Sequence, residues 1–174
     1  KAGDWSFTNA YLNMEYRGGT CDNTDIQDKE AGIYALFGFL ALYDLTQDPH
    51  WLEGATGAAD YTETWTYAWS FPVHTPWPKH PFNQYSISGQ SIITIGGGAD
   101  VYMAACSYTY YRLYLLTGDA HYLDFAQFIH KNTRQSNDID GTTGYIMPGL
   151  GHESGNFSSQ KLGSQYHWLP WCTF

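Results

Sequence analysis

Two stretches that share one turn decide the fold of this chain: Leu42-Tyr-Asp-Leu-Thr-Gln-Asp-Pro-His-Trp-Leu52 and Leu113-Tyr-Leu-Leu-Thr-Gly-Asp-Ala-His-Tyr-Leu123. In each, an apolar helix pattern stops at a threonine, and a second helix pattern starts after an aspartate two residues later. Such an aspartate caps the second helix, because its carboxylate accepts hydrogen bonds from the free N–H groups of the first turn. Pro49 suits a helix start and Gly118 suits a helix end. The two stretches therefore predict two helical hairpins, 71 residues apart.

The helices before and after each turn differ in their apolar patterns. Residues 29–46 and 99–117 are apolar nearly all round, which predicts inner helices enclosed by others. Residues 49–68 and 120–132 have one apolar stripe and one charged side, which predicts outer helices. We therefore expect a mainly α fold of the (α/α) toroid kind, built from hairpins, with long loops that hold short strands.

The first twenty residues are ambiguous. Trp5 and Phe7 alternate with polar residues as in a strand, and Tyr11 and Met14 follow without a clear period. Alternation favours a strand, and the lack of a sustained period favours an irregular lead-in. Both alternatives stay open at this point.

Composition excludes several classes of function. The chain has 174 residues, 43% of them hydrophobic and 18% aromatic, so it can bury a core. Its net charge of −9 argues against nucleic acid as a partner. No apolar run is long enough to span a membrane. An aromatic-rich, lysine-poor composition is typical of secreted carbohydrate-active proteins, so we expect an extracellular or periplasmic location.

Cysteine usage does not decide the redox compartment. The three cysteines, Cys21, Cys106 and Cys172, are odd in number and widely spaced. They form neither a disulfide framework nor a zinc motif of the Cys-x-x-Cys kind. We therefore predict no metal site, and the state of the three thiols stays open.

Acidic residues gather before the inner helices. Short turns join each inner helix to its outer partner, so the long loops should all open at the mouth formed by the inner-helix N-termini. Asp25 and Asp28 precede the first inner helix, and Asp100 precedes the second. In one interpretation Asp25 is the N-cap and Asp28 lies in the first turn. In the other, two of these carboxylates flank a glycosidic bond, since its hydrolysis needs paired carboxyl groups with separated pKa values.

Aromatic and imidazole side chains in the long loops are candidates for substrate binding. Flat aromatic rings suit stacking on the apolar faces of sugars, whereas a loop histidine is ordinarily a solvated polar group. The candidates are Trp69, His74, Trp77, Tyr85, His152 and Glu153.

The paired signatures Leu45-Thr-Gln-Asp-Pro-His-Trp-Leu52 and Leu116-Thr-Gly-Asp-Ala-His-Tyr-Leu123 resemble those of the six-hairpin glycosidase superfamily, which includes unsaturated glucuronyl hydrolases and N-acylglucosamine 2-epimerase-like enzymes. The resemblance covers about residues 28–132. It implies that residues 1–174 form a single partial domain of an incomplete (α/α)6 barrel, with the remainder of the same toroid as a partner. It also implies catalytic acids at the inner-helix N-terminal mouth.

The function that follows is a carbohydrate-active enzyme, a glycoside hydrolase acting on an oligosaccharide or polysaccharide without a cofactor. A polysaccharide lyase on the same fold is one alternative. A non-catalytic glycan-binding or structural module is another. A hairpin signature specifies the fold and not the reaction, so the three remain open.

Overall fold

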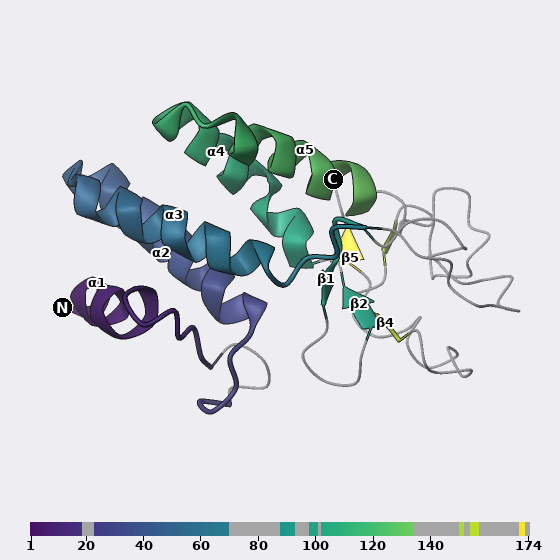
Figure 1. The fold of residues 1–174 in the computed structure, drawn as a ribbon, viewed down its shortest axis with the longest axis horizontal. Coiled ribbons are helices and arrows are strands. Elements are labelled where there is room, and N and C mark those ends of the chain that lie inside the picture. The colour runs from purple at the N-terminus through teal and green to yellow at the C-terminus, as the bar shows by residue number, and fades with distance from the viewer. Residues whose placement is uncertain are drawn as a thin grey trace, which may run out of the picture. The chain divides into compact units, whose positions relative to one another are not determined.

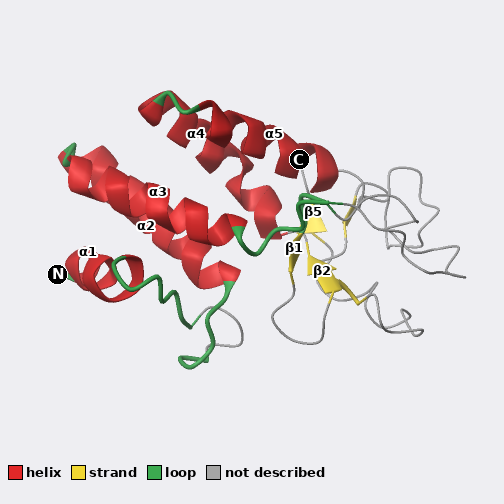
Figure 2. Ribbon diagram, in the orientation of Figure 1, coloured by secondary structure: helices red, strands yellow, loops and turns green. Residues whose placement is uncertain are grey.

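The computed structural model describes residues 1–18, 23–69, 88–92, 98–100, 102–133, 150–151, 154–156 and 171–172. The chain divides into two compact units, Lys1–Trp65 and Thr66–Phe174. Helices make up most of the described residues, which confirms the expected mainly α class (Figure 2). Among the described helices, none combines the length and the apolar character needed to cross a membrane.

The first unit contains one helical hairpin and an N-terminal helix. α1 (Ala2–Ser6) continues directly into a π-helical segment, η1 (Phe7–Tyr11). α2 (Lys29–Thr46) and α3 (Pro49–Glu63) lie side by side and form the hairpin (Figure 1). α2 has the bounds expected from its sequence pattern. The hairpin core consists of Ile33, Leu36, Phe39 and Leu40 from α2 and Trp51, Ala55, Ala58 and Ala59 from α3.

α3 is shorter than the helix expected over residues 49–68. It ends at Glu63, and the next two N–H groups bond three residues back: Thr64 N to Tyr61 O (3.1 Å) and Trp65 N to Thr62 O (3.1 Å). Such bonds tighten the last turn and end the helix.

The second unit contains the other hairpin. A 3₁₀ segment, η3 (Tyr102–Cys106), leads into α4 (Ser107–Thr117), and α5 (Ala120–Thr133) packs against α4. The expectation of a helix over 99–117 is wrong at its start. Residues Gly98–Asp100 form a strand, β2, because their backbone groups pair with two other short strands instead of with a helical turn.

The short strands expected in the long loops are present. β2 lies between β1 (Ser91–Ile92) and β4 (Ser154–Asn156), and both pairings are antiparallel. β3 (Leu150–Gly151) pairs with β5 (Trp171–Cys172) in a second antiparallel ladder.

The turn of the first hairpin is held by side-chain hydrogen bonds. Thr46 Oγ1 donates to Leu42 O (2.7 Å) and accepts from Asp48 N (3.3 Å). Asp48 Oδ1 in turn accepts from His50 N (3.0 Å) and so caps α3. The threonine hydroxyl therefore bonds both to the last turn of one helix and to the capping residue of the next.

The turn of the second hairpin repeats these bonds. Thr117 Oγ1 donates to Leu113 O (2.7 Å) and accepts from Asp119 N (3.1 Å), and Asp119 Oδ1 accepts from His121 N (2.9 Å). The predicted caps Asp48 and Asp119 are both confirmed.

The residue between the threonine and the aspartate has a left-handed backbone conformation in both turns. Gly118 has a φ of 75°, which costs glycine little. Gln47 has a φ of 56°, where a side chain is disfavoured. Its Nε2 donates to Tyr43 O (3.1 Å) and Asp44 O (3.2 Å), and these bonds offset part of that cost.

The repeat extends from the turn into the core, which the sequence patterns did not reveal. In the first hairpin the rings of Phe39 and Trp51 have centroids 6.0 Å apart. The residues 71 positions later, Tyr110 and Tyr122, have centroids 6.2 Å apart. All four side chains are buried. The two hairpins therefore share one packing scheme.

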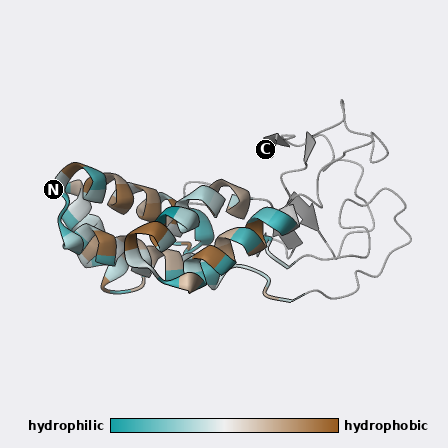
Figure 3. Ribbon diagram, turned by 90° about the horizontal axis from the view of Figure 1, so that it is seen from above, coloured by the Kyte–Doolittle hydropathy of each residue, from teal (hydrophilic) through white to brown (hydrophobic). Residues whose placement is uncertain are grey.

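Both helices expected to be inner have exposed apolar side chains. On α2, Tyr34 is 64% exposed and Leu45 is 82% exposed. On α4, Tyr108 is 71% exposed and Leu115 is 61% exposed. Hydrophobic and hydrophilic residues accordingly alternate along the described helices (Figure 3). Thus the described residues enclose neither helix on all sides.

Replacing Asp119 with alanine is expected to lower the free energy of unfolding by about 1 kcal/mol, since the first-turn N–H of His121 loses its acceptor. Urea denaturation followed by circular dichroism measures the change. Gln127→Ala, at an exposed position of the same helix, is the control and should leave stability within about 0.5 kcal/mol. Equal effects of the two substitutions would contradict a capping role.

Candidate functional site

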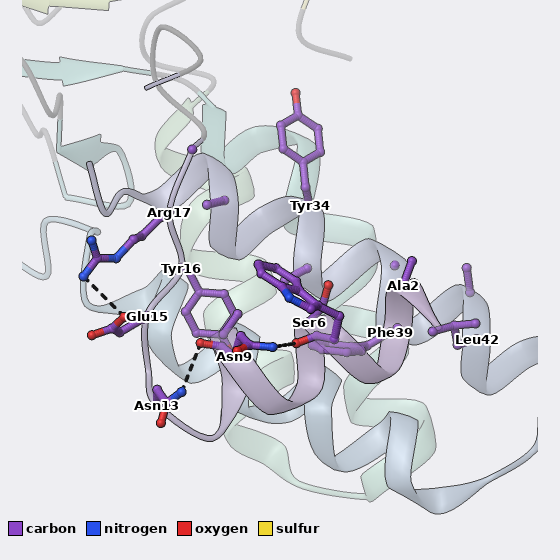
Figure 4. A pocket seen from close by; sticks show the side chains of 18 of the residues that line it. Ala2, Ser6, Asn9, Asn13, Glu15, Tyr16, Arg17, Tyr34, Phe39 and Leu42 are labelled. Carbon is purple, nitrogen blue, oxygen red and sulfur yellow. Dashed lines mark hydrogen bonds and ion pairs between the residues drawn. The ribbon is translucent and has the colours of Figure 1, made fainter. Parts of the chain in front are cut away.

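A groove of about 1010 Å³ lies between residues 2–18, which we call the N-terminal segment, and α2 (Figure 4). Every residue that lines it belongs to the first unit. Its size is at the upper end of the range usual for small-molecule sites. The groove is therefore the candidate site that the described residues provide.

One wall of the groove is the N-terminal segment, and Phe7 packs this segment against the hairpin. The Phe7 ring stacks on His50 with centroids 3.6 Å apart and meets Trp51 edge-on at 6.4 Å. Gly3 lies against Leu42 and Trp51, where a Cβ would lie 2.5 Å from the leucine Cδ1. The segment approaches α2 this closely because Gly3 has no side chain.

The floor of the groove is a face of α2 with small side chains. Ala31, Ala35, Gly38 and Ala41 all line the groove, and their spacing places them along one side of the helix. A Cβ at Gly38 would have no neighbour within 4 Å. The floor therefore leaves room for a ligand along α2.

Two exposed aromatic rings border this floor. Trp5, on α1, is 66% exposed, and Tyr34, on α2, is 64% exposed. Figure 4 shows the Tyr34 ring standing away from its helix. Each ring thus has an accessible face.

Amide side chains follow Trp5 along the N-terminal segment. Asn9 Nδ2 donates to Trp5 O (2.8 Å), and Asn13 Nδ2 donates to Asn9 O (3.3 Å) and Thr8 O (3.2 Å). Both asparagines line the groove. Their bonds to the backbone fix the orientation of these amides.

An ion pair closes one end of the groove. Arg17 Nη2 lies 3.3 Å from Glu15 Oε2, and their side chains are 44% and 47% exposed (Figure 4). A pair this exposed contributes little to stability. It does place hydrogen-bond donors and acceptors next to each other at the groove.

Tyr16, between these two charged residues, is the buried polar residue of the groove. It is 1% exposed, and its ring lies over Tyr61 with centroids 4.4 Å apart. Its hydroxyl has no hydrogen-bond partner among the described residues. Burial raises the pKa of the Tyr16 hydroxyl well above its ordinary value, so this group stays protonated.

The capping interpretation named the wrong aspartate. Asp28, not Asp25, is the N-cap of α2: its Oδ1 accepts from Ala31 N (3.0 Å), and the residue is fully buried. Asp25 is exposed, in a turn where its N–H donates to Asn23 Oδ1 (2.9 Å). The helix starts later than the acidic stretch suggested because Asn23 supplies its own turn.

Asp100 is not in the first turn of a helix. Its backbone belongs to β2, opposite Ser91 of β1 and Ser154 of β4. It also belongs to the second unit, whereas Asp25 and Asp28 belong to the first. The hypothesis that Asp100 and Asp28 face each other stays a prediction.

The other candidates of the long loops are mostly outside the described residues. Trp69 is described, and it is 70% exposed in the second unit. His74, Trp77, Tyr85, His152 and Glu153 lie outside the described residues.

The sequence patterns missed Trp5, Asn9, Arg17 and Tyr34. Neither a strand nor an irregular lead-in describes the N-terminal segment, because residues 2–11 are helical. The missed signal is a spacing of four: Trp5, Asn9 and Asn13 border the groove, and Gly3, Phe7 and Tyr11 contact the hairpin.

Thiol and metal chemistry have no support in the described part of the chain. Cys106 is free and fully buried, and burial raises its pKa to about 12, so it is a poor nucleophile. Among the described residues, no group of three or more His, Cys, Asp or Glu side chains is arranged to hold a metal ion.

The two interpretations of Asp28 give different expected results. If Asp28 only caps α2, Asp28→Asn keeps an acceptor for Ala31 N and stability changes little, while Asp28→Ala loses about 1–2 kcal/mol. Thermal and urea unfolding measure both variants. A glycan-cleaving activity that disappears in a stably folded Asp28→Asn variant would contradict the purely structural role.

Comparisons of the chain with protein-family models, curated proteins and solved structures found no match.

Proposed function

We propose that this chain belongs to a carbohydrate-active protein and that the groove beside α2 binds a glycan. The observation that carries the proposal is the pair of exposed rings, Trp5 and Tyr34, at the border of a groove of about 1010 Å³. Sugar rings have apolar faces that pack on aromatic rings, and such rings contribute much of the contact area at binding sites.

The polar groups of the groove can form hydrogen bonds with the hydroxyl groups of a sugar. Hydroxyl groups both donate and accept hydrogen bonds. The groove offers the Asn9 and Asn13 amides, the Glu15 carboxylate and the Arg17 guanidinium. A ligand with alternating apolar faces and hydroxyl edges uses both kinds of group.

Hydrolysis of a glycosidic bond is the activity that we propose for the complete site. It needs two carboxyl groups and no cofactor. In the first unit the cap takes up one oxygen of Asp28, so Glu15 and Asp25 become the candidates. Glu15 lines the groove, and Asp25 follows Thr24, which also lines it. Glu15→Gln and Asp25→Asn, measured separately for product release, test this assignment.

Titration of the 174-residue chain with oligosaccharides tests binding. Trp5→Ala is expected to weaken the affinity about tenfold, which corresponds to about 1.4 kcal/mol. Leu12→Ala is the matched control, because Leu12 is similarly exposed (61% against 66% for Trp5) on the same segment but does not line the groove. An unchanged affinity in Trp5→Ala would reject the groove as the glycan site.

The reaction products separate the three alternatives. A hydrolase releases new reducing ends, and a lyase releases an unsaturated product that absorbs in the ultraviolet. Binding without either product identifies a non-catalytic module.

A further inference from the structure

We propose that the glycan bound in this groove is neutral, without carboxylate or sulfate groups. The inference rests on the proposed function and adds the class of ligand. It is carried by the charges around the groove and by the way in which they are paired.

Two charged residues, Glu15 and Arg17, are among the described residues that line the groove, and they neutralise each other. An anionic sugar would need the guanidinium of Arg17. To bind there it must either displace Glu15 or place its own charge beside that carboxylate. Like charges at about 4 Å repel by about 1 kcal/mol even at the dielectric constant of water.

The surroundings of the groove add to this repulsion. Asp25 is exposed next to Thr24 of the lining, and the whole chain carries a net charge of −9. Arg17 is the one cation among the described lining residues, and it is already paired.

A neutral sugar avoids these costs and can still use the ion pair. The guanidinium donates and the carboxylate accepts, so two adjacent hydroxyl groups can bind side by side without separating Arg17 from Glu15. Figure 4 shows this pair at one end of the groove and Ala2 and Leu42 at the other. The polar end fixes the orientation of a sugar whose apolar face packs on Trp5.

Calorimetric titration of the full chain compares neutral oligosaccharides of glucose, xylose and mannose with oligogalacturonates of equal length, in 20 mM and 300 mM NaCl. We expect the neutral ligands to bind at least tenfold more tightly, with little dependence on salt. Tighter binding of oligogalacturonate that weakens with salt would overturn the inference and leave the glycan-binding proposal intact. Failure of every glycan to bind would overturn both.

A charge-changing variant tests the ion pair directly. Glu15→Gln frees Arg17, so this variant is expected to gain affinity for oligogalacturonate at low salt and to lose that gain in 300 mM NaCl. Asp124→Asn, at an exposed position of α5 that is not part of the groove lining, changes the net charge equally, and it should gain no affinity. Equal gains in the two variants would show that net charge alone excludes anions and would overturn the role of the pair.

Discussion

Replacing Phe39 with alanine is expected to lower the free energy of unfolding of the first unit by about 3–5 kcal/mol. Phe39 is 1% exposed, and its ring is 6.0 Å from that of Trp51 and 6.1 Å from that of Phe7. It therefore joins α2 to α3 and to the N-terminal segment. The truncation removes these contacts and leaves a cavity that the surrounding helices fill only in part.

Urea denaturation with tryptophan fluorescence as the probe measures this loss, because Trp51 contacts the ring that is removed. Tyr34→Ala is the control: it truncates an aromatic residue of the same helix that is 64% exposed, and it should change stability by no more than about 0.5 kcal/mol. If Phe39→Ala costs no more than Tyr34→Ala, Phe39 is not the residue that joins the three segments.

The hairpin turns were predictable because their chemistry is local. Thr46, Asp48, Thr117 and Asp119 bond to backbone groups at most four residues away. Such contacts need no knowledge of the remaining fold, and the caps were confirmed. The shared packing of Phe39 on Trp51 and of Tyr110 on Tyr122 follows the same register, but it depends on contacts between helices.

The errors occurred where distant residues decide the local structure. Residues 99 and 100 were expected to begin a helix, yet Gly98–Asp100 form β2 because β1 and β4 offer pairing partners. The pattern of residues 2–11 was compatible with a strand or an irregular lead-in, yet the segment is helical because Phe7 and Tyr11 pack on α3. β4 and α3 are distant in sequence from the segments that they contact, so pattern and propensity could not reveal these contacts.

The sequence patterns predicted an acidic stretch before α2 but not the groove. The acidic stretch before α2 was expected to lie at a helix N-terminus, and Asp28 does lie there, but as a cap. The groove itself arises from packing of residues 2–18 against α2. Its exposed rings, Trp5 and Tyr34, and its ion pair of Glu15 and Arg17 are not aspartates. A search of the sequence for paired aspartates therefore does not find them.

Gly57→Val is expected to destabilise the first unit by about 1–3 kcal/mol. Gly57 lies on α3 directly beneath the ring of Tyr11, so that any Cβ at this position overlaps the ring. Tyr11 also donates from its hydroxyl to Glu53 Oε1 (3.0 Å). A valine forces the ring out of its place and breaks this bond, which loosens the N-terminal segment from the hairpin.

Gly38→Ala is the matched control, since a Cβ at Gly38 would meet nothing within 4 Å. In the interior of α2 this change should stabilise the helix by about 0.5–1 kcal/mol. Unfolding experiments compare the two variants, and trypsin cleavage after Arg17 reports how firmly the N-terminal segment is held. Equal stability and equal cleavage in the two variants would contradict the close packing of Tyr11 on Gly57.

The same variant connects the packing of the N-terminal segment to the proposed site. Trp5, Asn9 and Asn13 lie on the segment that Gly57→Val loosens, whereas Tyr34 lies on α2. If the groove binds a glycan, the variant should lose affinity although it changes no lining residue. Retained affinity in a protein with a loosened segment would count against the groove as the glycan site, because Trp5 lies on that segment.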